Sequence, residues 1–313
     1  MSKIALLAIG VSLILIQKYF QPISIQLQFI IFVTGILFLG IPHGAADLLV
    51  ATQNNLNENK PLSKLKFFIN YLGRLILFSL SLWFFPLPAT LLFIIFSAYH
   101  FGETDLYQFK ITNITGLLFV ISYGMIIIDV IILSHFEEAK LLFKIFNLNS
   151  KQTELINLIE QYRYVILFFS ALFFFICTFI NFFVNGRDQK KNGEFLVQLA
   201  LISSILFFLP MILGFTLYFI VWHSVLSLSN IVSYLRKDDL YAATFIAKQI
   251  SIYSVLAIVG IILFGLSGFM LMDHNSMTLS IFIGLAVLTA PHMQIMHEMY
   301  NNTRTYHTTT KKI

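Results

Sequence analysis

The chain has 313 residues, of which 58% are hydrophobic and only 11% are charged, and its mean hydropathy is +0.83. Because a soluble domain carries about 25% charged residues, this composition excludes an ordinary soluble protein and indicates an integral membrane protein. The single cysteine, Cys177, excludes an internal disulfide framework, and the net charge of +5 in such a protein reflects topology and anionic lipid rather than nucleic-acid binding.

Apolar runs of about bilayer length follow one another along the chain and predict an all-α, polytopic helical bundle of about ten spans, with eight as the lower bound of roughly eight to ten. Pro22, Pro86 and Pro210 each fall at a junction between runs. The first run is expected to be a retained span, because no small-residue cleavage site of a secretory signal follows it. The predicted spans are 4–20, 23–46, 67–86, 88–108, 114–134, 163–185, 194–209, 211–234, 249–272 and 277–300.

Basic residues are distributed unevenly between the two sides of this topology. Most of them, including Lys64, Lys190 and Arg236, lie in connections on the same side as the two termini. Cytoplasmic connections of membrane proteins are enriched in lysine and arginine. The pattern therefore predicts cytoplasmic N- and C-termini, an even number of spans, and a multi-pass protein of the cell's inner (plasma) membrane.

Two segments outside the spans have patterns of their own. The connection at 135–162 mixes apolar and charged residues, which predicts short amphipathic helices either on the membrane surface or in a solvated loop. Residues 301–313 are polar and predict a disordered cytoplasmic tail. No internal repeat is evident, so residues 1–300 are expected to form a single transmembrane helical domain.

Four histidines lie inside apolar segments, where an imidazole is costly and usually faces the interior of the helix bundle. They are His43, His100, His223 and His292. The sequences around them are Gly-Ile-Pro-His-Gly-Ala-Ala-Asp at 40–47, Tyr-His-Phe-Gly-Glu-Thr-Asp at 99–105, His-Ser at 223–224 and Gly-Leu-Ala-Val-Leu-Thr-Ala-Pro-His-Met at 284–293.

All four histidines fall on spans that run in the same direction in this topology. At about 1.5 Å per residue their depths differ by roughly 12 Å, so they occupy a common layer in the inner half of the membrane. This common depth predicts that they meet around one metal ion. Imidazole suits iron, zinc, copper and nickel. A set of imidazoles without thiolate favours Fe²⁺ with open positions for dioxygen, and zinc with a bound water is the alternative.

Acidic residues near the histidines are candidates to support them. Asp47 follows His43 by four residues on the same helix face, and it is placed to bind the second ring nitrogen of a neighbouring ligand. Glu103, three residues after His100, is a candidate for the same role. Asp105 is expected to lie at the membrane surface.

The other histidines are expected to lie away from this site. His297 follows His292 by five residues, which turns it by about 140° on a helix. His135 and His274 lie at the outer ends of spans, and His307 lies in the tail.

Taken together, the four sequences resemble the Brp/Blh family of bacterial and archaeal β-carotene 15,15′-dioxygenases, over nearly the whole chain. The resemblance implies a multi-span membrane protein that cleaves β-carotene at its central double bond with dioxygen, giving two molecules of retinal, with iron held by histidines. By position it implies that His43, His100 and His223 are iron ligands, and His292 matches the histidine of the family's Pro-His-Met motif. It also suggests an indirect link to a retinal-binding rhodopsin.

One position departs from the family pattern. The third motif commonly reads His-Ser-x-x-His, but this chain has Ser227 four residues after His223, and serine is a poor iron ligand. Either His292 completes the site, with Ser227 in a supporting position, or the protein is a divergent member with an altered substrate or weak activity. A membrane metalloenzyme that acts on another carotenoid or on lipid, and a non-enzymatic transporter with an intramembrane histidine cluster, are the alternatives.

Overall fold

The computed structural model describes residues 3–57, 60–107, 109, 113–143, 150–185, 189–236, 241–269 and 277–309. Every regular element in this part of the chain is a helix, which confirms the predicted all-α class. Two of the elements, η1 and η2, are π-helices. In order, the helices are α1 Lys3–Tyr19, α2 Ile25–Gly35, η1 Ile36–Gly40, α3 Ile41–Ala45, α4 Asp47–Asn57, α5 Lys64–Phe84, α6 Pro86–Asp105, α7 Ile114–Ser134, α8 Phe136–Phe143, α9 Ser150–Asn185, α10 Gln189–Phe208, α11 Met211–Phe215, η2 Thr216–His223, α12 Ser224–Leu235, α13 Ala243–Phe269 and α14 Met277–Thr309.

Helices begin where the sequence supplies the chemistry for a helix start. Pro86 is the first residue of α6 and Pro210 is the N-cap of α11, positions where the missing N–H of proline costs nothing. Asn113 precedes α7, and its Oδ1 accepts a hydrogen bond from the backbone N–H of Gly116 at 2.9 Å. The predicted junctions at Pro86 and Pro210 are therefore confirmed.

Six helical segments of the described residues are long and apolar enough to cross a membrane, which is compatible with a membrane protein. His43 lies in one of them and His223 in another, whereas α6 and α14, which carry His100 and His292, are not among the six. The count of about ten spans and the cytoplasmic position of the termini stay predictions. The six segments are Ile25–Asn57, Lys64–Phe84, Ile114–Ser134, Ser150–Asn185, Met211–Leu235 and Ala243–Ile262.

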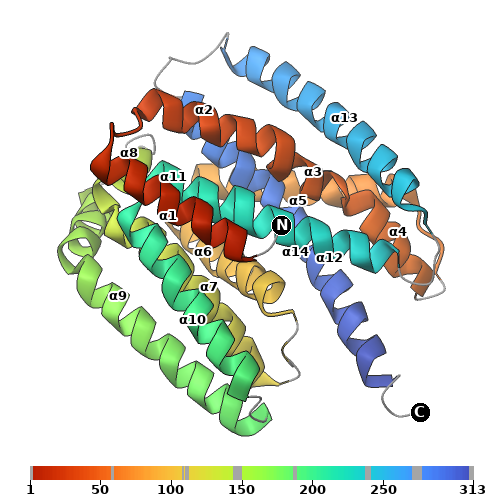
Figure 1. The fold of residues 1–313 in the computed structure, drawn as a ribbon. Helices are drawn as coiled ribbons and strands as arrows, with labels where there is room; N and C mark the ends of the chain where they lie inside the picture. Colours follow the sequence, from red (N-terminus) through yellow and green to blue (C-terminus); the bar gives the residue numbers. More distant parts are fainter. Residues whose placement is uncertain are drawn as a thin grey trace. The chain divides into compact units, whose positions relative to one another are not determined.

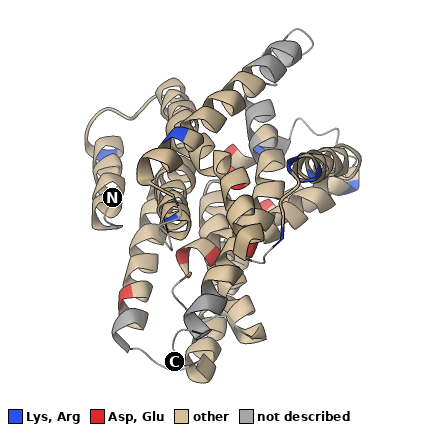
Figure 2. Ribbon diagram, turned by 90° about the vertical axis from the view of Figure 1, so that its right-hand side faces the viewer, with Lys and Arg blue, Asp and Glu red and all other residues tan. Residues whose placement is uncertain are grey.

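Large apolar side chains are exposed along these helices, and charged residues are sparse. Most of the helical ribbon carries neither basic nor acidic residues (Figure 2). Trp83 is 80% exposed and Phe168 is 64% exposed. Because contiguous apolar surface of this kind is unfavourable in water, these faces fit contact with lipid.

Two segments differ from the sequence prediction. In the connection at 135–162, α8 is a short helix as expected, but α9 runs unbroken into the following apolar segment, because Ser150–Asn185 contains neither proline nor glycine. α14 continues to Thr309, so residues 301–309, predicted to belong to a disordered tail, are helical. Residues 310–313 lie outside the described residues.

The chain divides into two compact units. Unit 1 consists of Met1–Ile36 and Ser97–Val225, and unit 2 consists of Leu37–Phe96 and Leu226–Ile313. The boundaries fall inside η1, α6 and α12, so three helices have residues in both units. The expectation of one transmembrane domain over residues 1–300 stays a prediction.

In unit 1, α7 packs against α9 and α10, and the three helices lie side by side (Figure 1). α7 is buried along most of its length. The rings of Phe119, Phe174 and Phe195 contact one another, with centroid separations of 6.5, 5.6 and 6.3 Å. Aromatic clusters of this kind bury a large apolar area. The aromatic cluster of unit 1 holds α7 against α9 and α10, and α6 packs against α7.

The contact between α6 and α7 brings backbone against backbone. A Cβ atom added to Gly124 would lie 1.8 Å from the carbonyl oxygen of Ala98, and one added to Gly102 would lie 2.1 Å from that of Val120. Only glycine permits such an approach, because it has no Cβ. His100 lies on α6 between Ala98 and Gly102, so this crossing sets its position relative to α7.

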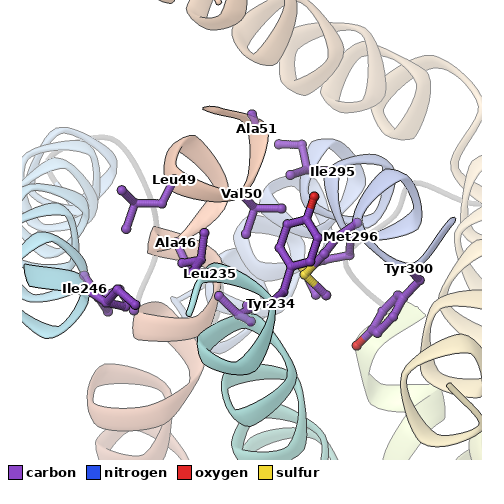
Figure 3. Close-up of a cluster of buried hydrophobic side chains, with 13 residues drawn as sticks. Ala46, Leu49, Val50, Ala51, Tyr234, Leu235, Ile246, Ile295, Met296 and Tyr300 are labelled. Atoms are coloured by element: carbon purple, nitrogen blue, oxygen red, sulfur yellow. The ribbon is translucent and has the colours of Figure 1, made fainter. Parts of the chain in front are cut away.

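Unit 2 has a hydrophobic core of its own, drawn from α4, α12, α13 and α14 (Figure 3). Val50, Tyr234 and Met296 are buried in it. The hydroxyl group of Tyr234 donates to Oδ1 of Asn54 at 2.6 Å and accepts from Nδ2 of Asn57 at 2.9 Å. A buried tyrosine needs such partners, and these bonds tie α12 to α4.

Candidate metal centre

His43 lies three residues after a π-helical segment, η1. Pro42, near the start of α3, has no N–H to donate, and its ring conflicts with the carbonyl group of Phe38, so the regular α-helical hydrogen bond between these two residues cannot form. The wider turn of η1 precedes it. His43 is buried, and its Nδ1 donates to the carbonyl oxygen of Leu39 at 3.4 Å. The lone pair of the neutral ring then lies on Nε2, the nitrogen that would bind a metal.

The second histidine of unit 2, His292 on α14, is held by an aspartate. Its Nδ1 donates to Oδ1 of Asp47 at 2.6 Å, and the hydroxyl group of Tyr71 on α5 donates to Oδ2 of Asp47 at 3.3 Å. The rings of His43 and His292 have centroids 5.0 Å apart and planes at 79°. Asp47 thus contacts the ring nitrogen of a neighbouring histidine, as expected from its position; the part of this contact in metal binding stays a prediction.

Unit 1 contains the other two histidines. η2 ends at His223, and the rings of His223 and His100 have centroids 4.8 Å apart and planes at 70°. Phe101 packs against His223 at a centroid distance of 4.8 Å, and Phe219 stacks on it at 5.9 Å with planes at 11°. Both histidines are buried. The aromatic rings therefore keep the His100–His223 pair apart from water.

Both pairs have a spacing that suits two ligands of one metal ion. An imidazole nitrogen binds zinc or iron at about 2.1 Å, which places the ring centroid about 3.2 Å from the ion. Two rings at tetrahedral or octahedral angles then have centroids about 4.5–5.3 Å apart. The observed separations of 5.0 and 4.8 Å lie within this range.

A pair of imidazoles does not by itself complete a metal site. Within the part of the chain that the structure describes, no three side chains of His, Cys, Asp or Glu form a group that could hold an ion. Borderline nitrogen donors without thiolate fit Fe²⁺ or Zn²⁺. The donor chemistry of each pair is therefore compatible with iron.

The remaining candidates make other contacts. Glu103 is buried and its Oε1 accepts a hydrogen bond from the hydroxyl group of Tyr99 at 2.8 Å, one turn earlier on α6. Ser227 is fully buried on α12. His297 contacts Asn301 on its own helix, with Nε2 and Nδ2 2.8 Å apart. Among the described residues, none of these three joins a histidine pair in a group of three His, Cys, Asp or Glu side chains that could hold an ion.

Three other histidines were expected to lie away from the site. His135 follows α7, and its Nδ1 lies 3.1 Å from the carbonyl oxygen of Ile131. His274 lies outside the described residues, and His307 lies in α14 with a side chain that is not described.

The structure corrects the expectation for Asp105, which is not at the surface but only 6% exposed. Its Oδ2 accepts hydrogen bonds from the hydroxyl groups of Tyr123 at 2.7 Å and Tyr218 at 3.0 Å, and from the indole N–H of Trp222 at 3.3 Å. Sequence reasoning missed these donors, and it missed Tyr71, because helix periodicity does not show which distant helices pack together. The only sign was a carboxylate at the end of an apolar run.

Comparison with known proteins gives one family. A family model described as beta-carotene 15,15'-dioxygenase matches residues 34–300, which include all four histidines and Asp47. No curated protein and no solved structure matches the chain. Because the family model covers most of the 313 residues, the chain belongs to the beta-carotene 15,15'-dioxygenase family.

Proposed function

We propose that this protein is an iron-dependent membrane dioxygenase that cleaves β-carotene at its central 15,15′ double bond and releases two molecules of retinal. It crosses the plasma membrane several times and binds one Fe²⁺ through His43, His100, His223 and His292. The observation that carries the proposal is the family match, which contains all four histidines. The two histidine pairs, at centroid separations of 5.0 and 4.8 Å, support the assignment of the ligands.

The location of the enzyme suits the substrate. β-Carotene is a long, rigid, apolar polyene that dissolves in the bilayer, so a site within the membrane receives it from lipid without passage through water. Fe²⁺, when bound, supplies the activation of dioxygen. One carbon–carbon double bond is broken, and each of its two carbons receives one oxygen atom of dioxygen, so the reaction consumes no external reductant.

The residues of the chain orient the histidines and exclude water. Asp47 accepts from Nδ1 of His292, which fixes the ring orientation and leaves Nε2 to face the ion. Tyr71 holds the second oxygen of Asp47. Phe101 and Phe219 pack against the His223 ring and would keep water from the reacting polyene.

The serine at position 227 bears on which residue is the fourth iron ligand in this proposal. The family commonly has a histidine at this position, and the serine hydroxyl group is a weak ligand for iron. His292 takes the fourth position instead, since its Nδ1 is committed to Asp47 in the manner of ligating histidines.

The activity is tested in bacteria that accumulate β-carotene. Expression of the wild-type protein should remove the orange colour and produce retinal that can be extracted and measured. His43→Ala and His100→Ala should produce none, while His297→Ala, on the same helix as His292, should behave as wild type. Normal retinal yield from His43→Ala or His100→Ala would refute the proposed site.

Iron stoichiometry tests whether the two pairs serve one ion. The purified protein should carry close to one iron per chain, and His292→Ala should lower this value. Two iron ions per chain would assign one ion to each pair and favour a di-metal lipid enzyme. A protein that binds no iron and forms no retinal would favour a transporter.

A further inference from the structure

One carboxylate oxygen of Asp105 accepts hydrogen bonds from three uncharged donors. It is the last residue of α6, and its Oδ2 accepts from Tyr123 of α7 and from Tyr218 and Trp222 of η2, at 2.7, 3.0 and 3.3 Å. Two or three charge-assisted hydrogen bonds to one buried carboxylate are strong and specific in geometry. The three bonds fasten α6, α7 and η2 to one another within unit 1.

The segment that Asp105 holds is the one that presents His223. Tyr218 and Trp222 both belong to η2, and Trp222 directly precedes His223. π-Helical turns are rare and occur mostly at functional sites. Because the wider turn has no regular α-helical hydrogen-bond ladder, side-chain bonds from outside η2 have a large part in fixing its register. Two such bonds flank His223: Trp222, directly before it, donates to Asp105, and the hydroxyl group of Ser224, directly after it, donates to the carbonyl oxygen of Phe219 at 3.0 Å.

Asp105 itself is placed by the crossing of α6 and α7. Gly102 lies three residues before it, and a Cβ atom there would lie 2.1 Å from the carbonyl oxygen of Val120, so α6 has little freedom to move at this point. Asp105 follows His100 by five residues, which turns it about 140° away from His100 on the helix. Asp105 is therefore positioned to hold the segment that carries His223 rather than to share an ion with His100.

We infer that Asp105 is a positioning residue of the dioxygenase: through Tyr218 and Trp222 it holds η2 in its π-helical register and so keeps the His223 ring against that of His100. This inference rests on the proposed function, because its importance for catalysis depends on His100 and His223 being metal ligands. Asp105 acts through η2 and does not contact the reacting atoms.

The test compares Asp105→Ala and Tyr218→Phe with Thr216→Val in the full-length, detergent-purified protein. Thr216 is a matched control, since it is a buried residue of η2 whose hydroxyl group donates to the carbonyl oxygen of Ile212. The readouts are the affinity for Co²⁺ as a probe of the iron site, the visible spectrum of the Co²⁺-loaded protein, and retinal formation. Asp105→Ala should lower Co²⁺ affinity about tenfold or more and alter the spectrum, and Tyr218→Phe should do the same to a smaller extent. Thr216→Val should leave both unchanged.

A second readout needs no metal. The chain has two tryptophans, so in a Trp83→Phe background the fluorescence reports Trp222 alone. Loss of its hydrogen bond to Asp105 should shift the emission of the metal-free Asp105→Ala protein, and Thr216→Val should not. If Asp105→Ala does not fold, Tyr218→Phe, which removes a single hydroxyl group, carries the test.

The outcomes separate this inference from the proposed function. Folded variants at Asp105 and Tyr218 with the Co²⁺ affinity, spectrum and Trp222 emission of Thr216→Val would overturn the positioning role alone. A wild-type protein that binds neither Fe²⁺ nor Co²⁺ would overturn the proposed function and the role of Asp105 with it.

Discussion

Substitution of Gly124 by alanine should separate α6 from α7 and displace His100. A Cβ atom at this position would lie 1.8 Å from the carbonyl oxygen of Ala98, 2.4 Å from its carbonyl carbon and 2.6 Å from its Cα. All three are backbone atoms, so no flexible side chain can move aside. Because favourable contact between such atoms lies at about 3.5 Å, the two helices would have to move apart by more than about 1 Å.

The expected cost follows from this clash. Overpacking a tightly packed interior costs about 1–3 kcal/mol and occasionally more, and a clash with backbone belongs at the upper end, about 3 kcal/mol. Metal sites tolerate misplacement of only about 0.5 Å. His100, two residues after Ala98, would exceed that tolerance, so metal affinity and retinal formation should fall together with stability.

Gly73→Ala is the matched control, since a Cβ atom at Gly73 on α5 would meet nothing within 4 Å. That change should stabilise the protein by about 0.5–1 kcal/mol, because alanine is the better helix former. Unfolding of both variants in detergent, followed by circular dichroism, gives the comparison, and iron content gives the second readout. Equal stability and equal iron content of the two variants would refute the close backbone crossing as the determinant of the position of His100.

Three further changes have expected outcomes. Asp47→Ala should lower the affinity of the protein for Fe²⁺ by about 10- to 100-fold, because it removes the acceptor of the His292 Nδ1 proton; metal titration measures this, and an unchanged affinity would contradict it. Removal of iron with a chelator should stop retinal formation and lower the melting temperature, and added Fe²⁺ should restore both. The reason is that a ligand that binds only the folded state stabilises it. A melting temperature that does not change with iron would count against a site made of residues from distant helices. Glu138→Ala should destabilise the protein by about 1 kcal/mol, because Oε2 of Glu138 accepts a hydrogen bond from the N–H of Met211 at the start of α11. Thermal unfolding measures this loss of stability. The control Glu298→Ala, at an exposed position on α14, should show no such loss.

The helices were predictable because their causes are local. The apolar runs are long, and Pro86 and Pro210 mark helix starts in the structure as they do in the sequence. The unbroken course of α9 was missed because the charged residues near Glu160 resemble a surface segment, although no residue there interrupts a helix. Glu160 is in fact paired with Lys140 of α8, which brings the two helices together.

The burial of the candidate site residues was predictable in part, and for a different reason. An imidazole inside an apolar segment is costly enough to single out His43 and His292 as interior residues without knowledge of the fold, and both are buried. The contact between Asp47 and His292 joins residues 245 positions apart, and only the chemistry of ligating histidines indicated it. Asp105 was missed because its donors come from α7 and η2, and no local pattern distinguishes a carboxylate buried among tyrosines from one at a membrane surface. The π-helical geometry of η1 and η2 was missed because five to eight residues are too few to reveal a changed period.

The two π-helical segments make chain length itself a determinant of the site. A π-helical turn takes up about one residue more than an α-helical turn. Each segment lies next to a histidine: η1 ends three residues before His43, and η2 ends at His223. A wide turn absorbs its extra residue locally, so deletion of a single residue from either segment would let that turn relax to the α form while the helix beyond it kept its orientation. Scanning mutagenesis that only exchanges side chains would not expose this dependence, whereas one-residue deletions in Ile36–Gly40 or Thr216–Trp222 would remove the wide turn while all four histidines were still present.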